Sequence, residues 1–320
     1  MPPVNTNRDL RVVFMGTPEF AVASLEALLA DGWNIVAVVT APDKAGGRGM
    51  KLMSSAVKQA ALKHRIPLLQ PEKLKDPVFL EELRGYKADI QVVVAFRMLP
   101  ELVWNMPPLG TINLHASLLP AYRGAAPINW AIMNGESVSG VTTFRLQQEI
   151  DTGNILLQEK VAIADTDNAG TLHDKLKETG AALLVQTLRG IADKTIIEIP
   201  QEQLQPDANK TSALPSAPKI FTGTCLIDWN RPVKQVYDHI RGLSPYPAAF
   251  TYIGEKMLKI YEARIILDEP VAAPGTIHSD QKTFLRFAAL DGYIECLEIQ
   301  LSGKKRMAAD AFLRGNTIVT

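Results

Sequence analysis

The segment LRVVFMGTPEF, residues 10–20, indicates the class of fold of this chain. Residues 10–15 are mostly apolar and include two β-branched valines, which predicts a buried strand. Thr17 can cap a helix through its hydroxyl and Pro18 suits the first helical position, so we expect a helix from here to about Leu29. A buried strand that leads directly into a helix is the opening unit of an α/β fold.

The alternation of strand and helix continues along the first half of the chain. Further strands are predicted at residues 34–40, 66–69, 89–96 and 111–114, with helices at residues 54–64 and after Asp76-Pro77. This pattern predicts an α/β domain with a Rossmann-like, mostly parallel sheet that is covered on both faces. Residues 138–146 and 155–163 predict two adjacent strands that extend the sheet in antiparallel fashion, and residues 171–189 predict a closing helix.

The second half of the chain predicts a separate, smaller domain. Four prolines stand between positions 200 and 218 with little hydrophobic periodicity, which predicts a linker at residues 201–218. The first domain would then be residues 1–200 and the second residues 219–320. Short strands, glycine-containing turns and one helix near residues 232–241 predict a small, OB-like β-barrel for the second domain.

The composition predicts a globular protein of a reducing compartment. The chain has 320 residues, with 34 basic and 34 acidic side chains, and its two cysteines, Cys225 and Cys296, form neither a disulfide framework nor a metal-ligand cluster. The first ten residues lack the apolar core of a signal peptide, and no segment approaches about 20 consecutive apolar residues. We therefore expect a cytoplasmic monomer without a membrane partner, whose contacts with RNA would come from local basic patches.

Three familiar motifs can be excluded. The first strand is followed by Gly16-Thr17-Pro18, not by the G-x-G-x-x-G of dinucleotide-binding folds. The glycines at 46, 47 and 49 lack the G-K-[ST] ending of a phosphate-binding P-loop. Asp151-Thr152-Gly153 matches the triplet of aspartic proteases, but that chemistry needs two carboxylates that share a proton, and the chain has one such triplet.

Polar side chains that could carry chemistry stand at the end of a predicted strand. Asn113 and His115 are two residues apart, so they share one face of the strand. Open α/β sheets bind ligands beyond the carboxyl ends of their strands. Asp151 lies in a glycine-containing loop and could orient the imidazole. An isolated pair of this kind is more often a half-buried His beside a structural Asn, but the Pro- and Gly-marked loop that follows favours a catalytic site, because buried polar groups are costly without partners.

These residues belong to motifs that resemble one known family. N-x-H-x-S-L-L-P at residues 113–120, R-G-A-A-P-I at residues 123–128 and I-D-T-G at residues 150–153 are similar to motifs of the folate-dependent formyltransferases. The loop PDKAGGRGMKLM at residues 42–53 and the segment IRGLSPYP at residues 240–247 resemble the branch that formylates methionyl-tRNA. The resemblance spans nearly the whole chain.

The resemblance implies transfer of a formyl group from 10-formyltetrahydrofolate to the α-amine of initiator methionyl-tRNA, without a metal ion. The first domain would be catalytic and the second would bind tRNA. Position by position, the resemblance implies catalytic roles for Asn113, His115 and Asp151. It implies folate contacts from Ser117, Leu118, Leu119, Pro120, Phe96 and Arg97, and tRNA contacts from Arg48 and Lys51.

Three positions depart from the family pattern. Arg97 and Glu149 each stand where glycine is common, and Met50 stands where a basic residue is usual. Arg97 lies beside the expected pterin pocket. We expect its guanidinium to pair with the acidic tail of the folate or with Glu149.

Rival functions remain open at this stage. A sibling enzyme with the same catalytic core would formylate an amino sugar nucleotide or glycinamide ribonucleotide, or would hydrolyse the formylfolate. A nonenzymatic RNA-binding protein would have no use for Asn113, His115 and Asp151. Arg48 and Lys51 are either a basic finger for RNA or part of an ordinary solvated loop. From Ala213 onward, thirteen basic residues against eleven acidic ones give a net charge of only +2, which does not argue for RNA binding by itself.

Overall fold

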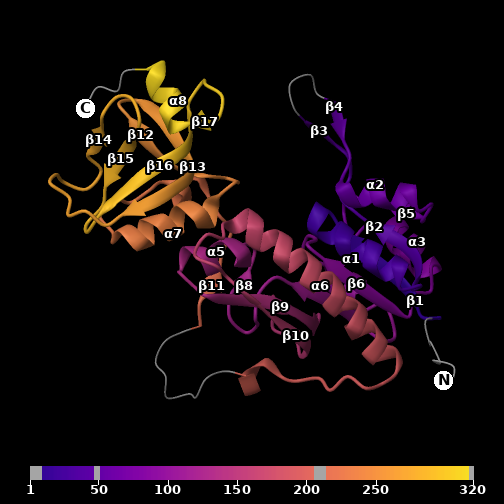
Figure 1. The fold of residues 1–320 in the computed structure, drawn as a ribbon. Coiled ribbons are helices and arrows are strands. Elements are labelled where there is room, and N and C mark those ends of the chain that lie inside the picture. Colours follow the sequence, from indigo (N-terminus) through magenta and orange to yellow (C-terminus); the bar gives the residue numbers. More distant parts are fainter. Residues whose placement is uncertain (1–8, 47–50, 205–213, 317–320) are drawn as a thin grey trace. The chain divides into compact units, whose positions relative to one another are not determined.

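Figure 1 shows the computed structural model of the protein, which describes residues 9–46, 51–204 and 214–316. The chain forms two compact units. Unit 1 comprises Met1–Arg123, Gly140–Val161 and Asp174–Pro215, and unit 2 comprises Gly124–Ser139, Ala162–His173 and Ser216–Thr320. Two segments from the middle of the chain thus belong to the same unit as its C-terminal part.

Seven of the described strands form the sheet of unit 1, in the order β10-β9-β7-β6-β1-β2-β5. Their bounds are Arg11–Gly16 for β1, Asn34–Val39 for β2, Leu68–Leu69 for β5, Ile90–Val94 for β6, Thr111–His115 for β7, Val138–Arg145 for β9 and Ile155–Ala162 for β10. Strands β5, β2, β1, β6 and β7 pair in parallel, whereas β9 pairs antiparallel with β7. This confirms the predicted Rossmann-like sheet and its antiparallel extension.

The first three helices follow their predicted start signals, with one correction. Helix α2 (Ala56–Lys63) is capped by the Ser55 hydroxyl, and helix α3 (Pro77–Gly85) by the Asp76 carboxylate. For helix α1 (Glu19–Ala30), the predicted Thr17 cap is wrong, because Pro18 is the N-cap residue and no side chain caps this helix. Pro18 is extended, with ψ 176°, and its own carbonyl accepts the Ala21 amide at 3.0 Å, so helical geometry begins only at Glu19.

The remaining helices and short strands complete the chain. The helices are α4 (Glu101–Trp104), α5 (Pro127–Met133), α6 (Ala169–Ala192), α7 (Val233–Leu243) and α8 (Ala309–Arg314), with 3-10 turns η1 (Gln201–Leu204) and η2 (Thr222–Cys225). The short strands are β3 (Lys44–Gly46), β4 (Lys51–Met53), β8 (Arg123–Gly124) and β11 (Ser216–Ala217). No helix among the described residues is both long and apolar enough to span a membrane.

The two faces of the unit 1 sheet pack on different helices. On one face, the alternating residues Val13, Met15 and Val93 are buried in a cluster with Phe79 and Leu83 of α3. On the other face, α6 crosses the sheet so closely that a Cβ at Gly180 would lie 2.9 Å from Leu114 of β7 (Figure 1). Because side chains alternate along a strand, Asn113 and His115 point to the face away from α6.

Unit 2 contains an antiparallel, curled sheet in the order β12-β13-β16-β15-β14, with β17 beside β16. The bounds are Ala249–Ile253 for β12, Lys256–Ile266 for β13, Ile277–Ser279 for β14, Leu285–Ala288 for β15, Tyr293–Leu301 for β16 and Met307–Ala308 for β17. The predicted barrel therefore takes the form of a half-barrel, in which the described end strands β12 and β14 do not pair with each other.

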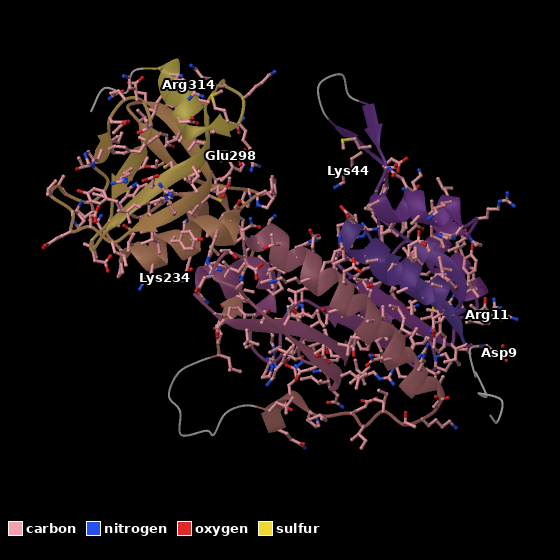
Figure 2. The ribbon with its side chains drawn as sticks, in the orientation of Figure 1. Asp9, Arg11, Lys44, Lys234, Glu298 and Arg314 are labelled. Atoms are coloured by element: carbon pink, nitrogen blue, oxygen red, sulfur yellow. The ribbon has the colours of Figure 1, made fainter. Side chains whose placement is uncertain are left out.

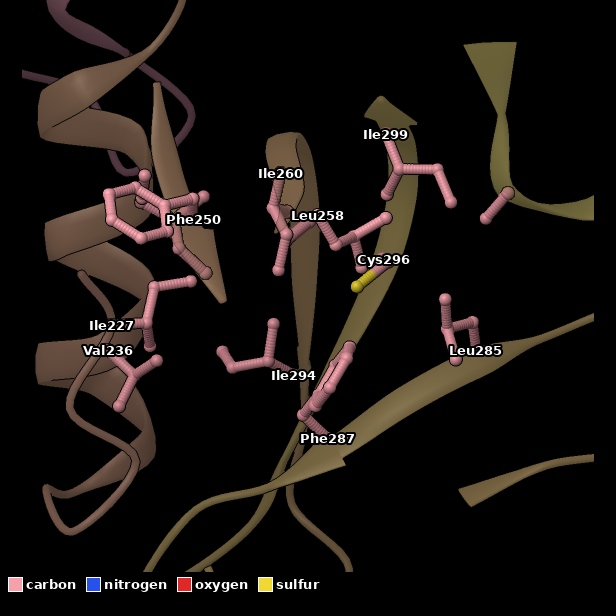
Figure 3. Close-up of a cluster of buried hydrophobic side chains, with 14 of the residues drawn as sticks. Ile227, Val236, Phe250, Leu258, Ile260, Leu285, Phe287, Ile294, Cys296 and Ile299 are labelled. Atoms are coloured by element: carbon pink, nitrogen blue, oxygen red, sulfur yellow. The ribbon is translucent and has the colours of Figure 1, made fainter. Parts of the chain in front are cut away.

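Helix α7 supplies one wall of the unit 2 core. Figure 3 shows Val236 of α7 beside Ile227, with Phe287 and Ile294 on the sheet that faces them. The ring of Phe287 stacks on Trp229 with centroids 4.8 Å apart and planes within 9°. This aromatic pair joins the segment before α7 to strand β15.

The segment at residues 240–247 serves the internal packing of unit 2. Arg241 is 5% exposed, and its guanidinium binds the Asp238 carboxylate at 2.7 Å and the Asp167 carbonyl at 2.9 Å. The Ser244 hydroxyl donates to the Tyr261 carbonyl at 2.7 Å. Arg241 and Ser244 of this segment thus stabilise the fold of unit 2.

We predict that Phe287→Ala destabilises unit 2 by about 3–5 kcal/mol, because it removes a stacked, fully buried ring and leaves a cavity. The free energy of unfolding from guanidinium titration measures the loss. Leu290→Ala is the control, since Leu290 is 54% exposed and outside the core, and should change stability by less than about 0.5 kcal/mol. Equal losses in the two variants would show that this core is wrongly described.

Candidate functional site

Asn113 and His115 lie at the carboxyl end of β7, near the middle of the unit 1 sheet. Asn113 pairs in register with Val93 of β6 and with Phe144 of β9, so it is flanked by buried apolar side chains. His115 is the last residue of β7 and is 8% exposed. The structure thus places both side chains on one face at the edge where parallel sheets bind ligands, as predicted.

The two ring nitrogens of His115 face different parts of unit 1. Nε2 lies 2.9 Å from the Tyr122 carbonyl oxygen, so this nitrogen carries a proton and donates it. Tyr122 is a buried residue with a φ of 59°, and the left-handed turn aims its carbonyl back at the ring. Nδ1 lies 3.9 Å from the Asp151 carboxylate oxygen Oδ2. The carbonyl, and not Asp151 as expected, is therefore the direct hydrogen-bond partner that fixes the tautomer.

Asp151 is held in a compact loop between β9 and β10. The loop closes where the Arg145 amide donates to the Asn154 carbonyl at 2.9 Å. Gly153 passes so near to Arg145 that a Cβ would lie 1.7 Å from the Arg145 carbonyl oxygen. Only glycine fits there. Asp151 itself has a φ of 55° and its side chain is 14% exposed, so the carboxylate is largely shielded from water.

Gln201 contacts this loop although the sequence analysis assigned it to the linker. It is 0% exposed, and its side-chain amide donates to the carbonyls of Asp151 and Gly153, each at 2.8 Å. Its Oε1 accepts from Arg123. A polar residue directly after Pro200 carries no periodic signal that would have marked it as buried.

The turn at Ser117–Pro120 is held by side chains of neighbouring strands. Thr142 Oγ1 donates to the Ser117 carbonyl at 2.7 Å and accepts from the Leu119 amide at 3.1 Å. Ser117 is 0% exposed and its hydroxyl donates to the Ala121 carbonyl at 2.8 Å. Leu119 and Pro120 are also buried, whereas Leu118 is half-buried. The Ser117 hydroxyl is thus used within the turn, whereas the Leu119 side chain packs with Phe144 and Ile155 of the neighbouring strands.

Phe96 and Arg97 follow the end of β6, the strand next to β7. Phe96 is half-buried against the cluster under α3, and the Arg97 guanidinium lies 5.6 Å from the centre of its ring. Arg97 donates to the Glu72 carbonyl at 2.8 Å and to the Pro71 carbonyl. Partial burial lowers the pKa of Arg97 below its ordinary value. The expected pairing of Arg97 with Glu149 is not formed, because backbone carbonyls already accept its hydrogen bonds.

The loop at residues 42–53 is a β-hairpin formed by β3 and β4. Lys44 pairs with Met53 and Gly46 with Lys51, and Lys44 is exposed on the hairpin (Figure 2). At its root, Lys58 donates to the Asp43 carboxylate at 2.6 Å, which lowers the pKa of that carboxyl. Arg48 lies outside the described residues, and only the backbone of Lys51 is described.

Metal ligands were not expected from the sequence. Within the described ranges of the chain, no group of three or more His, Cys, Asp or Glu side chains is arranged to hold a metal ion. The acid, base and amide groups of Asn113, His115 and Asp151 are the reactive groups that the site itself offers. Their arrangement suits proton transfer and stabilisation of a developing negative charge.

Comparison with known proteins places this chain in a family. The formyl transferase model matches residues 10–188, and the model of the formyl transferase C-terminal domain matches residues 219–317. The methionyl-tRNA formyltransferase of Bacteroides fragilis is 55% identical over 312 residues, covering 96% of this chain and 95% of the relative. That of Flavobacterium johnsoniae is 46% identical, covering 96% of each chain.

A solved structure supports the fold independently. An N-formyltransferase from Helicobacter canadensis, in complex with folinic acid and dTDP-3-aminofucose, matches with a TM-score of 0.66 and 20% identity, covering 90% of this chain and 98% of that chain. Sequence matches over both halves of the chain, together with the close relatives, lead to one conclusion. This chain belongs to the formyl transferase family.

Proposed function

We propose that this enzyme transfers the formyl group of 10-formyltetrahydrofolate to the α-amine of methionine on initiator tRNA. The supporting relatives are methionyl-tRNA formyltransferases that align over nearly their whole length. The observation that carries the chemistry is the pair of His115 and Asp151, 3.9 Å apart at the strand end that also bears Asn113. This placement supports formyl transfer. A nonenzymatic RNA-binding protein would not need these three side chains at one strand end.

Asn113 and His115 stabilise negative charge on the formyl oxygen. When the amine attacks the formyl carbon, charge moves onto that oxygen, and hydrogen-bond donors fixed in advance favour this change. The Asn113 amide supplies one donor. The Nε2–H group of His115 already donates a hydrogen bond to the Tyr122 carbonyl. Nδ1 is therefore the nitrogen that can interact with the reacting groups.

Asp151 provides the negative charge and proton acceptor that the reaction needs. A protonated Nδ1 is stabilised by the carboxylate that faces it, and the distance of 3.9 Å leaves room for a closer approach when the reacting groups are bound. The carboxylate also accepts the proton that the attacking amine loses, directly or through water. As the tetrahedral carbon becomes a carbonyl again, its bond to the folate nitrogen breaks. That nitrogen takes up the proton that the amine lost, returned by Asp151 or by water, so the products are the formylated amine and tetrahydrofolate.

The folate lies beside Phe96 and Arg97 in this proposal. A half-buried aromatic ring at the end of β6, one strand from the catalytic groups, offers an apolar face to a flat pterin ring, so the residues present fit the co-substrate. The Ser117–Pro120 turn makes further contacts through groups other than the Ser117 hydroxyl and the Leu119 amide, which already have hydrogen-bond partners. Folate supplies the formyl group.

Transfer RNA binds through the β3–β4 hairpin and the C-terminal domain in this proposal. Arg48 falls between β3 and β4 in the sequence and Lys51 is the first residue of β4, and phosphate contacts need little more than reach and positive charge. We also propose the division into a catalytic domain at residues 1–200, a linker at residues 201–218 and a tRNA-binding domain at residues 219–320. A cytoplasmic monomer that uses no metal is consistent with this assignment.

We predict that Asn113→Ala, His115→Ala and Asp151→Ala each lower single-turnover formylation by at least about a hundredfold, while circular dichroism shows a folded protein. Each change removes a charge-stabilising or proton-transferring group from the strand-end site. His64→Ala is the control, because His64 pairs with Glu26 on the outer helices and should retain the rate within about twofold. Near-normal transfer by any of the three would exclude that residue from the catalytic set.

For Arg97, we predict that Arg97→Gly weakens folate binding about tenfold with little change in kcat, because it frees the Pro71 and Glu72 carbonyls and uncovers the Phe96 ring. Titration calorimetry with a nonreactive folate measures the dissociation constant. Arg97→Met, which keeps the apolar stem over the ring, should lose less. An unchanged dissociation constant in Arg97→Gly would make Arg97 a bystander.

For the hairpin, we predict that replacing both Arg48 and Lys51 with alanine weakens the use of methionyl-tRNA and lowers the slope of log KM against log salt by about two, while folate binding is unchanged. The control is Arg84→Ala with Lys87→Ala, which removes the same charge at the opposite edge of the sheet, before β6 begins. If the hairpin variant and the control variant show the same slope of log KM against log salt, the hairpin does not contact tRNA and is only a connector.

A further inference from the structure

The segment that follows α6 packs against the Asp151 loop. The Ile199 amide donates to the Ile155 carbonyl at 2.9 Å, and the Ile155 amide donates to the Ile199 carbonyl at 2.8 Å, as in an antiparallel ladder. One residue earlier, the Glu198 carboxylate accepts from Arg145 at 2.9 Å and from Asn154 at 3.3 Å. Residues 198–199 thus bind both ends of the loop and bring the next residues against its centre.

Gln201 uses every hydrogen-bonding position of its side-chain amide. Nε2 has two protons, and these are donated to the carbonyls of Asp151 and Gly153, each at 2.8 Å. Oε1 has two lone pairs, and these accept from Nε and Nη2 of Arg123 at 3.1 and 2.5 Å. The side chain is fully buried, so losing any of these bonds would leave a polar group unsatisfied.

The two segments that Gln201 joins are the two that flank the His115 ring. Arg123 directly follows Tyr122, whose carbonyl accepts the proton of His115 Nε2. On the other side, Asp151 faces His115 Nδ1. A single buried amide therefore connects the side chain of Arg123, the residue after the one that holds Nε2, to the backbone of the loop that presents the carboxylate to Nδ1.

We infer that Gln201 is a positioning residue that sets the place of the Asp151 carboxylate relative to the His115 imidazole. The left-handed backbone at Asp151, with a φ of 55°, is strained for a non-glycine residue, and the bond from Gln201 to its carbonyl fixes the adjacent peptide. Gln201 acts through Asp151 and does not touch the reactants. This inference rests on the proposed catalytic role of Asp151.

The most informative variant is Gln201→Glu, because it preserves the shape of the side chain and its contact with Arg123. It removes both protons donated to the loop and places a carboxylate oxygen against two carbonyl oxygens, which repel it. We expect kcat for methionyl-tRNA formylation to fall at least about tenfold, with KM for both substrates changed by less than about threefold. Gln147→Glu is the matched control, because it makes the same change in the same loop at an exposed amide.

A double-mutant cycle separates positioning from simple structural support. If Gln201 acts through Asp151, Gln201→Glu should cost less than about threefold in the background of Asp151→Asn, where the carboxylate is already gone. An equal loss in both backgrounds, an unchanged kcat in Gln201→Glu, or the same loss in Gln147→Glu would overturn the inference. If Gln201→Glu fails to fold, Gln201→Met in the same cycle decides, since it removes the same two donors without a charge.

Failure of the proposed function would be recognised separately in this experiment. Asp151→Asn alone reports on the catalytic role of the carboxylate before any change at Gln201. A normal rate in that single variant would overturn both the role of Asp151 and the inference built on it. If Asp151→Asn is slow, but Gln201→Glu lowers kcat by the same factor with and without Asp151→Asn, only the role of Gln201 is overturned.

Discussion

The structure of the site depends on how the His115 ring is held between two chain segments. The hydrogen bond of 2.9 Å from Nε2 to the Tyr122 carbonyl leaves Nδ1 facing the Asp151 carboxylate, 3.9 Å away. Neither partner is in a relaxed backbone conformation, since both Tyr122 and Asp151 have positive φ values. The surrounding bonds, including those of Gln201, keep this arrangement in place.

Much of the fold could be predicted because its signals are local. The apolar run before Gly16 indicated β1, and Asp76-Pro77 indicated the start of α3, since a capping carboxylate and a proline act on their own turn. The spacing of Asn113 and His115 placed both on one face of β7 through the two-residue period of a strand. The cap of α1 was misplaced by one residue, because Thr17 and Pro18 both carry start signals and only geometry decides between them.

The rest of the site depends on contacts between residues far apart in sequence. Gln201 and Arg123 are 78 positions apart, and nothing near Gln201 in the sequence indicates burial, because prolines and the absence of periodicity favour a linker there. The role of Tyr122 is equally hidden, since its backbone carbonyl, not its side chain, binds His115. The alternative in which Arg97 pairs with Glu149 was wrong, because its guanidinium donates to the carbonyls of residues 71 and 72.

A direct competition between possible acceptors tests which amine the enzyme formylates. The enzyme is given 10-formyltetrahydrofolate together with methionyl-tRNA, an amino sugar nucleotide and glycinamide ribonucleotide, and formate release is followed as the measure of transfer to water. We expect kcat/KM for methionyl-tRNA to exceed that for each other acceptor by at least about a thousandfold. An acceptor that leaves hydrogen-bonding groups of the enzyme unpaired is strongly rejected. Preferential formylation of a nucleotide, or formate as the main product, would contradict this expectation.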